Sequence, residues 1–309
     1  MDLSLNKNAT RLLTGGIIGI IAIWCLVNGG IALLVLVSLI IYLGSKEYVQ
    51  ILKNKGFFPS LKVILFANTL FALLSYFNRP DLVALAFTVS SIVAFIWILL
   101  KGRQPYIANV STTILGFVYC GWFPSHLLFL RGLNAENYQG FLKLNVQNDG
   151  LGYVMFLFVT VLLTDIGCYY FGKKFGKHKL APVVSPKKTI EGSIGGVFCA
   201  IVGAFIVGHV INLAWYHCLI AGVLLTVFAQ IGDLSESLIK RDAGVKDSGT
   251  LLPGHGGFLD RTDGYVFTIP LAFYYFKYFV VSNQLWFDLV NFIKIFLHSF
   301  EGLLHAIGL

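Results

Sequence analysis

Acidic, basic and glycine residues are concentrated between Ser237 and Asp263, in a chain that is otherwise overwhelmingly apolar. Six of the 15 acidic residues lie within this segment or just before it: Asp233, Glu236, Asp242, Asp247, Asp260 and Asp263. The bases interleaved with them are Lys240, Arg241, Lys246 and Arg261. Charges between two hydrophobic segments are costly unless they bind ions or a charged ligand. The segment therefore predicts a metal-dependent, phosphate-handling site in a membrane protein.

The spacing of these residues predicts where their side chains point. Four of them are spaced at i, i+3, i+4 and i+7 and so share one helix face: Asp233, Glu236, Ser237 and Lys240. Asp260 and Asp263, three residues apart, open the next apolar segment. Two helix ends could therefore direct carboxylates at one point, and Mg²⁺ commonly bridges one or two carboxylates to substrate phosphates. We expect a metal site of Asp233, Asp260 and Asp263. The alternative is acids that are merely solvated beside lysines.

A second polar segment, Lys173–Glu191, is basic and is expected on the same side of the membrane as the acidic one. Together the two segments could hold metal ions on carboxylates and phosphates on lysines. Its residues Ser185, Lys187, Lys188 and Thr189 are expected to contact phosphate, because they run directly into the start of the next predicted helix.

Asp165 lies inside the apolar segment Gly150–Gly172, toward its predicted cytoplasmic end. An ionisable residue at such a depth suggests function, and the alternative is a structural pair with a neighbouring lysine. His255 is followed by Gly256 and Gly257, which allow the backbone to approach a phosphate closely. No second histidine or cysteine stands at zinc-ligand spacing, and no serine has the setting of a catalytic triad.

Composition indicates the fold class. Hydrophobic residues make up 57% of the 309, charged residues 12%, and the mean hydropathy is +0.78, whereas soluble domains carry about 25% charged residues. We expect an all-α polytopic membrane protein with nine spans. Single spans are predicted in 62–77, 82–100, 107–130, 150–172, 192–213, 215–232 and 264–281. Two short spans are predicted in 12–43, separated by a turn at Asn28–Gly30. Pro124 should end or kink the span in 107–130.

The basic residues orient this bundle. With the N-terminus in the cytoplasm, 18 of the 23 lie on predicted cytoplasmic segments, which fits the positive-inside rule. The positive net charge thus reflects topology and contact with the lipid bilayer, not nucleic-acid binding. We divide the chain into N-terminal spans (1–149), a catalytic membrane region (150–283) and an interfacial amphipathic tail (284–309). A homodimer is compatible with this organisation.

Two stretches of sequence resemble a known family. SLIKRDAGVKDSGTLLPGHGGFLDRTD, from Ser237 to Asp263, is similar to the signature of phosphatidate cytidylyltransferases, also called CDP-diacylglycerol synthases, without a departure over its 27 residues. SPKKTIEG, from Ser185 to Gly192, resembles the family's second polar loop. The resemblance covers roughly the C-terminal half of the chain.

This resemblance implies that CTP and phosphatidate react with Mg²⁺ to give CDP-diacylglycerol and pyrophosphate, at the cytoplasmic face of a bacterial-type inner membrane. Asp233 and Asp260 match the family's metal-binding carboxylates, and a second, monovalent cation such as K⁺ could share them. We expect catalytic roles for Asp233, Asp260, Asp263, Lys240, Arg241 and His255. We expect substrate contacts from Ser185, Lys187, Lys188, Thr189, Ser237, Lys246, Asp247, Gly256, Gly257, Arg261 and Asp165.

The chemistry of the residues agrees with this reaction. The phosphate of phosphatidate is already an oxyanion nucleophile, so catalysis reduces to positioning and charge neutralisation at the α-phosphorus of CTP. The alternatives within enzymes are a CTP-dependent lipid kinase and a cytidylyltransferase for another lipid. An ion or phosphate transporter is the alternative from another class. Transporters typically show repeats and midplane charges, whereas here the charges lie at one face.

Overall fold

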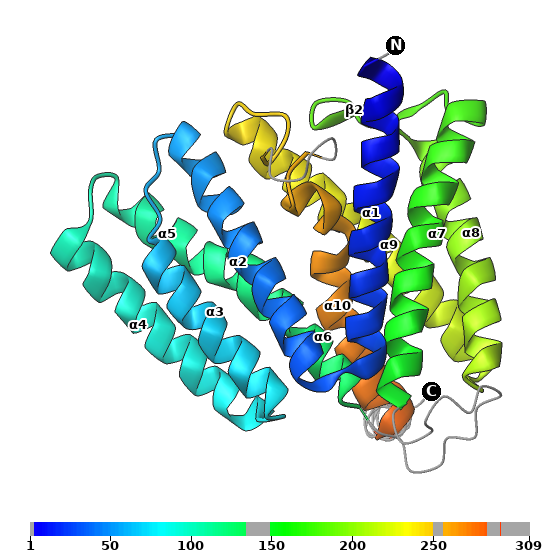
Figure 1. Ribbon diagram of the computed structural model, residues 1–309, viewed down its shortest axis with the longest axis horizontal. Coiled ribbons are helices and arrows are strands. Elements are labelled where there is room, and N and C mark those ends of the chain that lie inside the picture. The colour runs from blue at the N-terminus through cyan, green and yellow to red at the C-terminus, as the bar shows by residue number, and fades with distance from the viewer. Residues whose placement is uncertain (1–2, 134–148, 250–255, 283–290, 292–309) are drawn as a thin grey trace, which may run out of the picture.

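The computed structural model describes residues 3–133, 149–249, 256–282 and 291, and these residues are almost entirely helical (Figure 1). The α-helices are α1 (Leu3–Asn28), α2 (Gly30–Asn54), α3 (Leu61–Tyr76), α4 (Val83–Lys101), α5 (Tyr106–Phe117), α6 (Phe123–Arg131), α7 (Asp149–Phe175), α8 (Ile190–Val210), α9 (Trp215–Asp242) and α10 (Asp263–Tyr275). Single turns of 3-10 or π-helix are η1 (Pro80–Leu82), η2 (Val118–Trp122), η3 (Leu259–Arg261) and η4 (Phe276–Val281). Strands β1 (Lys179–Ala181) and β2 (Ser185–Thr189) form an antiparallel hairpin.

The predicted all-α membrane fold is confirmed. Among the described residues, seven helical segments are long and apolar enough to cross a membrane, and two shorter apolar helices, Gly15–Asn28 and Leu61–Tyr76, accompany them. Large apolar side chains such as Ile20, Leu99 and Ile107 are exposed, as expected of a surface that lipid covers. The number of nine spans stays a prediction.

The turn predicted near Asn28 is present, but the span after it was predicted too short. α1 ends at Asn28 and α2 begins at Gly30, with φ of 64° at Gly29 and 54° at Gly30, a region that favours glycine. α2 then continues to Asn54 and does not end near Leu43. The polar residues after Leu43 suggested a loop, yet Tyr48 and Leu52 are buried and keep this part of α2 packed.

The segment that Pro124 was predicted to end or kink does not end there and stays helical through a π-helical turn. α5, η2 and α6 follow one another without a loop. Pro124 lies in the first turn of α6, where a missing amide hydrogen costs little, and the wider turn η2 directly precedes it. The predicted irregularity is therefore accommodated inside one continuous span, Tyr106–Arg131.

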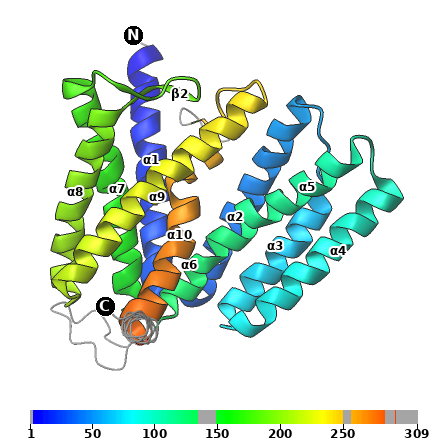
Figure 2. The same ribbon diagram turned by 180° about the vertical axis from the view of Figure 1, so that it is seen from behind.

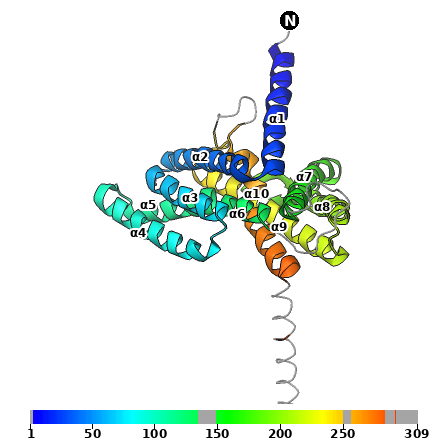
Figure 3. The same ribbon diagram turned by 60° about the horizontal axis from the view of Figure 1, so that its bottom comes forward.

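The helices form two groups that share central elements. α2 to α5 lie on one side, α7 and α8 on the other, and α6, α9 and α10 lie between them (Figures 1 and 2). α2 contributes to both apolar cores, with Leu33 in the one that contains Phe156 and Phe276, and Tyr48 in the one that contains Phe71. α1 stands away from the other helices toward its N-terminal end (Figure 3).

Glycines allow close approach of the helices of the second group. A Cβ at Gly167 of α7 would lie 2.7 Å from the carbonyl oxygen of Gly195 on α8, and one at Gly192 would lie 2.8 Å from the carbonyl of Cys168. Membrane helices gain association energy from such close backbone packing, since lipid supplies no hydrophobic drive between them. The hairpin and the C-terminal ends of α2, α7 and α9 lie at the same end of the bundle (Figure 1).

Candidate active site

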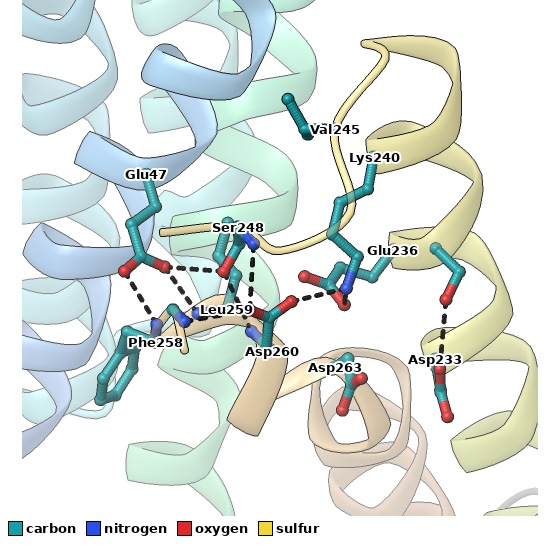
Figure 4. A network of polar contacts seen from close by, with 12 residues as sticks. Glu47, Asp233, Glu236, Lys240, Val245, Ser248, Phe258, Leu259, Asp260 and Asp263 are labelled. Atoms are coloured by element: carbon teal, nitrogen blue, oxygen red, sulfur yellow. Dashed lines mark hydrogen bonds and ion pairs between the residues drawn. The ribbon is translucent and has the colours of Figure 1, made fainter. Parts of the chain in front are cut away.

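The crossing of α9 and α10 brings the acids of the two helices together. A Cβ at Gly232 would lie 2.5 Å from the carbonyl oxygen of Asp263, so a larger residue would push the helices apart. The next residue, Asp233, therefore lies near Asp263, and Asp263 is close enough to Asp233 and Glu236 for the carboxylates to interact electrostatically. Figure 4 shows Asp263 between Asp260 and Asp233 in that view. Acids of α9 and of the start of α10 thus lie near one another, and α9 continues past the predicted span end at Gly232 to Asp242.

Lys240 of α9 forms one ion pair within its own helix and a second with the 3-10 turn η3 that precedes α10. Its Nζ lies 2.7 Å from Glu236 Oε2 and 2.6 Å from Asp260 Oδ1. Asp260 Oδ2 accepts hydrogen bonds from the amides of Ser248 and Gly257, both at 3.0 Å. Burial raises the pKa of the Asp260 carboxyl, but the bonds from Lys240 and the two amides outweigh it and hold that pKa below its usual value. Asp260 is therefore an anion at neutral pH.

A further ion pair joins α9, which carries the acids, to the basic hairpin. Lys188 Nζ of β2 lies 2.5 Å from Asp233 Oδ2, and Ser237 Oγ donates to Asp233 Oδ1 at 3.4 Å. Lys188 Nζ is buried and makes no hydrogen bond among the described residues, so its contact with Asp233 counts as an ion pair but not as a hydrogen bond. The two polar segments expected on one side of the membrane thus meet at this pair.

A cavity of about 460 Å³ opens where α7, the hairpin, α8 and α9 meet. Its polar lining includes Asp165, Lys173, Lys187, Lys188, Thr189, Ser193, Gln230 and Asp233. Ser193 Oγ donates to the side-chain oxygen of Gln230. Small-molecule sites typically enclose about 300–1,000 Å³. The volume of the cavity and its lining of both lysines and carboxylates suit a phosphorylated ligand together with a cation.

Other predicted site residues lie beside this cavity or support it. Thr189 is buried and caps α8, where its Oγ1 accepts from the amide of Gly192 at 3.2 Å. Ser185 pairs with Ala181 in the hairpin. Arg241 donates to the carbonyl of Val184 at the hairpin tip at 3.3 Å, which ties the hairpin to α9.

The remaining predicted residues are in the segment between α9 and α10. Gly256 has φ of 82°, and a Cβ on it would lie 3.2 Å from Asp260 Oδ2. Lys246, Asp247 and Arg261 are exposed and are not among the residues that line the cavity. His255 lies outside the described residues, so its predicted role stays a prediction.

The oxygen donors suit a hard divalent cation. Glu236 Oε1 is buried and, among the described residues, accepts no hydrogen bond, so this oxygen is available to a cation. Carboxylate and hydroxyl oxygens are the ligand type that Mg²⁺ prefers. Within the described part of the chain, no group of three or more acids, histidines or cysteines is gathered closely enough to hold a metal ion. Lys188 and Lys240 instead supply countercharge to Asp233 and Asp260.

Sequence reasoning missed one acid at the site. Glu47 of α2 accepts hydrogen bonds from the segment that holds Asp260 (Figure 4). Between Asp2 and Asp81 it is the sole acid of the chain, and an ionisable residue in an apolar helix is itself a signal of function. The signal was overlooked because the residues after Leu43 were interpreted as a loop.

Comparisons with known proteins agree with the geometry. A model described as the cytidylyltransferase family matches residues 9–279. A phosphatidate cytidylyltransferase of Synechocystis sp. is 38% identical over 288 residues, which cover 86% of this chain and 96% of that protein. One of Staphylococcus saprophyticus is 33% identical over 271 residues, 84% of this chain and 96% of that protein. One of Staphylococcus haemolyticus is 50% identical over a shorter stretch of 127 residues, 40% of this chain and 49% of that protein.

Proposed function

The chain belongs to the cytidylyltransferase family and makes CDP-diacylglycerol and pyrophosphate from CTP and phosphatidate, and we propose that it does so in the cavity between α7, the hairpin, α8 and α9. The assignment of this activity is supported by the match to phosphatidate cytidylyltransferases along nearly their whole length. The location is supported by the facing of Lys187 and Lys188 against Asp233 in one cavity.

The lysines neutralise the substrates. CTP and the phosphate of phosphatidate are both polyanions, and two of them cannot approach without countercharge. Lys188 is suited to this task. Its ammonium lies beside Asp233, and its N–H groups make no hydrogen bond among the described residues, so they are available to phosphate oxygens. Lys240 lies deeper, between Glu236 and Asp260, and keeps these carboxylates from repelling each other.

We propose that Mg²⁺ is held by carboxylates from the set Asp233, Asp260 and Asp263 together with substrate phosphates, because the acids of the described residues are not gathered closely enough to hold an ion alone. When bound, the ion would supply positive charge to the phosphate oxygens at the reacting centre. A second, monovalent cation such as K⁺ would share these oxygens, with Glu236 Oε1 as a further donor. Asp260 Oδ2 already accepts from two amides, whereas Oδ1 accepts from Lys240 and keeps a second lone pair for coordination.

No covalent enzyme intermediate is required. One phosphate oxygen of phosphatidate forms a bond to the α-phosphorus of CTP while the bond from that phosphorus to the bridging oxygen breaks, and pyrophosphate leaves. The protein's part is to hold the two phosphates in line and to neutralise their charge. Nothing in the described cavity lining reads as an activated serine or histidine nucleophile.

Incubation of the purified protein with phosphatidate and Mg²⁺ tests the function, using CTP labelled at either the α- or the γ-phosphorus. We expect a lipid-soluble product that carries the α-label and never the γ-label, and no product when a chelator removes Mg²⁺. A lipid product with the γ-label would identify a lipid kinase. Absence of any lipid-soluble product in the presence of phosphatidate would refute the activity.

We propose that the hairpin end of the bundle faces the cytoplasm, in a bacterial-type inner membrane. The excess of lysine and arginine on these segments supports this orientation. In a variant without its five cysteines, a cysteine placed at Ser185 should react with a membrane-impermeant thiol reagent only in inverted vesicles. Labelling in intact, right-side-out cells would contradict this orientation.

A further inference from the structure

Glu47 connects the N-terminal helices to the segment that holds Asp260. Its side chain is buried on α2 at 7% exposure and accepts three hydrogen bonds from residues more than 200 positions away. Ser248 Oγ donates to Oε2 at 3.1 Å, the amide of Leu259 donates to Oε2 at 2.9 Å, and the amide of Phe258 donates to Oε1 at 2.8 Å (Figure 4). Both carboxylate oxygens are therefore used by one short segment.

The segment is built to fit around this carboxylate. A Cβ at Gly249 would lie 2.8 Å from Glu47 Oε1, and a Cβ at Gly257 would collide with Ser248 Oγ. Glycines at these two positions let the backbone close around a buried anion, and its burial would be costly without the three donors. The contact therefore needs both the acid on α2 and the glycines of the later segment.

The same groups hold Asp260. Ser248 Oγ, which donates to Glu47, accepts from the amide of Asp260 at 3.3 Å. The amides of Ser248 and Gly257 donate to Asp260 Oδ2, and Oδ1 of the same carboxylate pairs with Lys240. A shift of Ser248 would therefore move the Asp260 carboxylate and, through it, the ammonium of Lys240.

α2 is held in place by packing next to Glu47. Its residues Tyr48 and Val49 are buried in the second apolar core together with Leu259, the neighbour of Asp260. Tyr48 also donates to the carbonyl of Thr112 on α5 at 2.9 Å. Glu47 is thus followed directly by buried, packed residues and can fix the position of the segment that binds it.

We propose that Glu47 is a positioning residue of the active site, which sets the place of Asp260 and Lys240 through Ser248 and the amides of Phe258 and Leu259. The proposal rests on the proposed function of this site. Glu47 does not touch the reacting atoms in this account. Its effect reaches the reaction through the carboxylate that we assign to Mg²⁺, so its loss should alter the metal requirement more than the binding of CTP.

Glu47→Gln tests the proposal, because it keeps the shape of the side chain and replaces one acceptor oxygen by an NH₂ donor. At least one of the three donors then loses its acceptor. Substitution of groups that orient metal ligands typically costs roughly 10–100-fold. We expect a fall of this size in kcat and a comparable rise in the Mg²⁺ concentration for half-maximal activity, with the KM for CTP changed by less than about three-fold.

Glu47→Asp keeps the charge and should recover part of both losses. Asp242→Asn is the matched control, because it also removes a carboxylate, from an exposed ion pair with Lys55 at 2.9 Å outside the cavity. Hydrogen exchange gives a readout that does not need the activity. The backbone amides of 256–260 should exchange faster in Glu47→Gln than in the parent protein and in Asp242→Asn.

The outcomes separate this proposal from the proposed function. A parent protein that makes no lipid product would refute the proposed function. Hydrogen exchange of the backbone amides of 256–260 would still decide whether Glu47 holds the segment. With an active parent, unchanged exchange or an unchanged Mg²⁺ requirement in Glu47→Gln overturns the positioning role. The same holds if activity falls only in proportion to the folded fraction. If Glu47→Gln does not fold, the same two measurements on Glu47→Asp decide.

Discussion

The Asp233→Asn variant is expected to lose turnover by on the order of 10³-fold while it remains folded. Asp233 lines the cavity and interacts with Asp263, and an uncharged amide oxygen binds a divalent ion more weakly than a carboxylate does. Its side chain is 34% exposed, so the ion pair with Lys188 adds only about 0–1 kcal/mol to stability. The measurement is the initial rate of CDP-diacylglycerol formation at saturating CTP, together with the melting temperature in detergent.

Asp242→Asn is the control on the same helix. Asp242 also pairs with a lysine, Lys55, but it is exposed and lies outside the cavity. It should keep a rate within about two-fold of the parent, since an exposed ion pair contributes little. Near-normal turnover in Asp233→Asn would remove Asp233 from the metal site. Equal losses in both variants would trace the effect to the fold of α9.

Lys188→Ala is expected to lower kcat/KM for CTP by roughly 10²-fold, because a preorganised charged donor at a reacting phosphate is worth about that much. The ammonium is held beside Asp233 and has donors available for phosphate oxygens. If the contact between Lys188 and the phosphate becomes stronger as charge moves to the leaving pyrophosphate, the variant should show a lower kcat in addition to a higher KM. Rates measured over a range of CTP concentrations separate these two effects.

Lys179→Ala is the matched control for this variant. Lys179 lies on the other strand of the same hairpin, is exposed, and is not among the residues that line the cavity. Its loss changes the net charge of the hairpin by the same amount. Unchanged kcat and KM in Lys188→Ala, or an equal effect in both variants, would mean that these lysines serve membrane topology and not the substrates.

The fold class and much of the acidic site were predictable because they depend on local sequence. A chain with so few charged residues has to bury its backbone polar groups in helices. The spacing of Asp233, Glu236 and Lys240 predicts one helix face wherever that helix lies. The sequence also places Lys188 shortly before a predicted helix, although its pairing with Asp233 depends on how the hairpin packs against α9.

Contacts between distant segments were not predictable in the same way. Glu47 looks like a loop residue beside Lys46, and its partners Ser248, Phe258 and Leu259 follow more than 200 residues later. Gly232 is one of 32 glycines, and only the crossing with α10 shows why it has no side chain. The basic segment was expected to be a loop. It forms a short hairpin, and the carboxylate of Glu191 accepts from the amides of Lys177 and His178 at its base.

The central claim is that this site joins CTP and phosphatidate in one direct transfer, and the stereochemistry at the α-phosphorus tests it most directly. A single in-line attack by the phosphate of phosphatidate inverts the configuration, whereas transfer through a nucleotidylated residue such as His255 would invert it twice. The measurement uses CTP with a chiral α-thiophosphate and determines the configuration of the thio-analogue of CDP-diacylglycerol. The account predicts inversion. Retention of configuration, or a labelled protein band after incubation with labelled CTP alone, would contradict it.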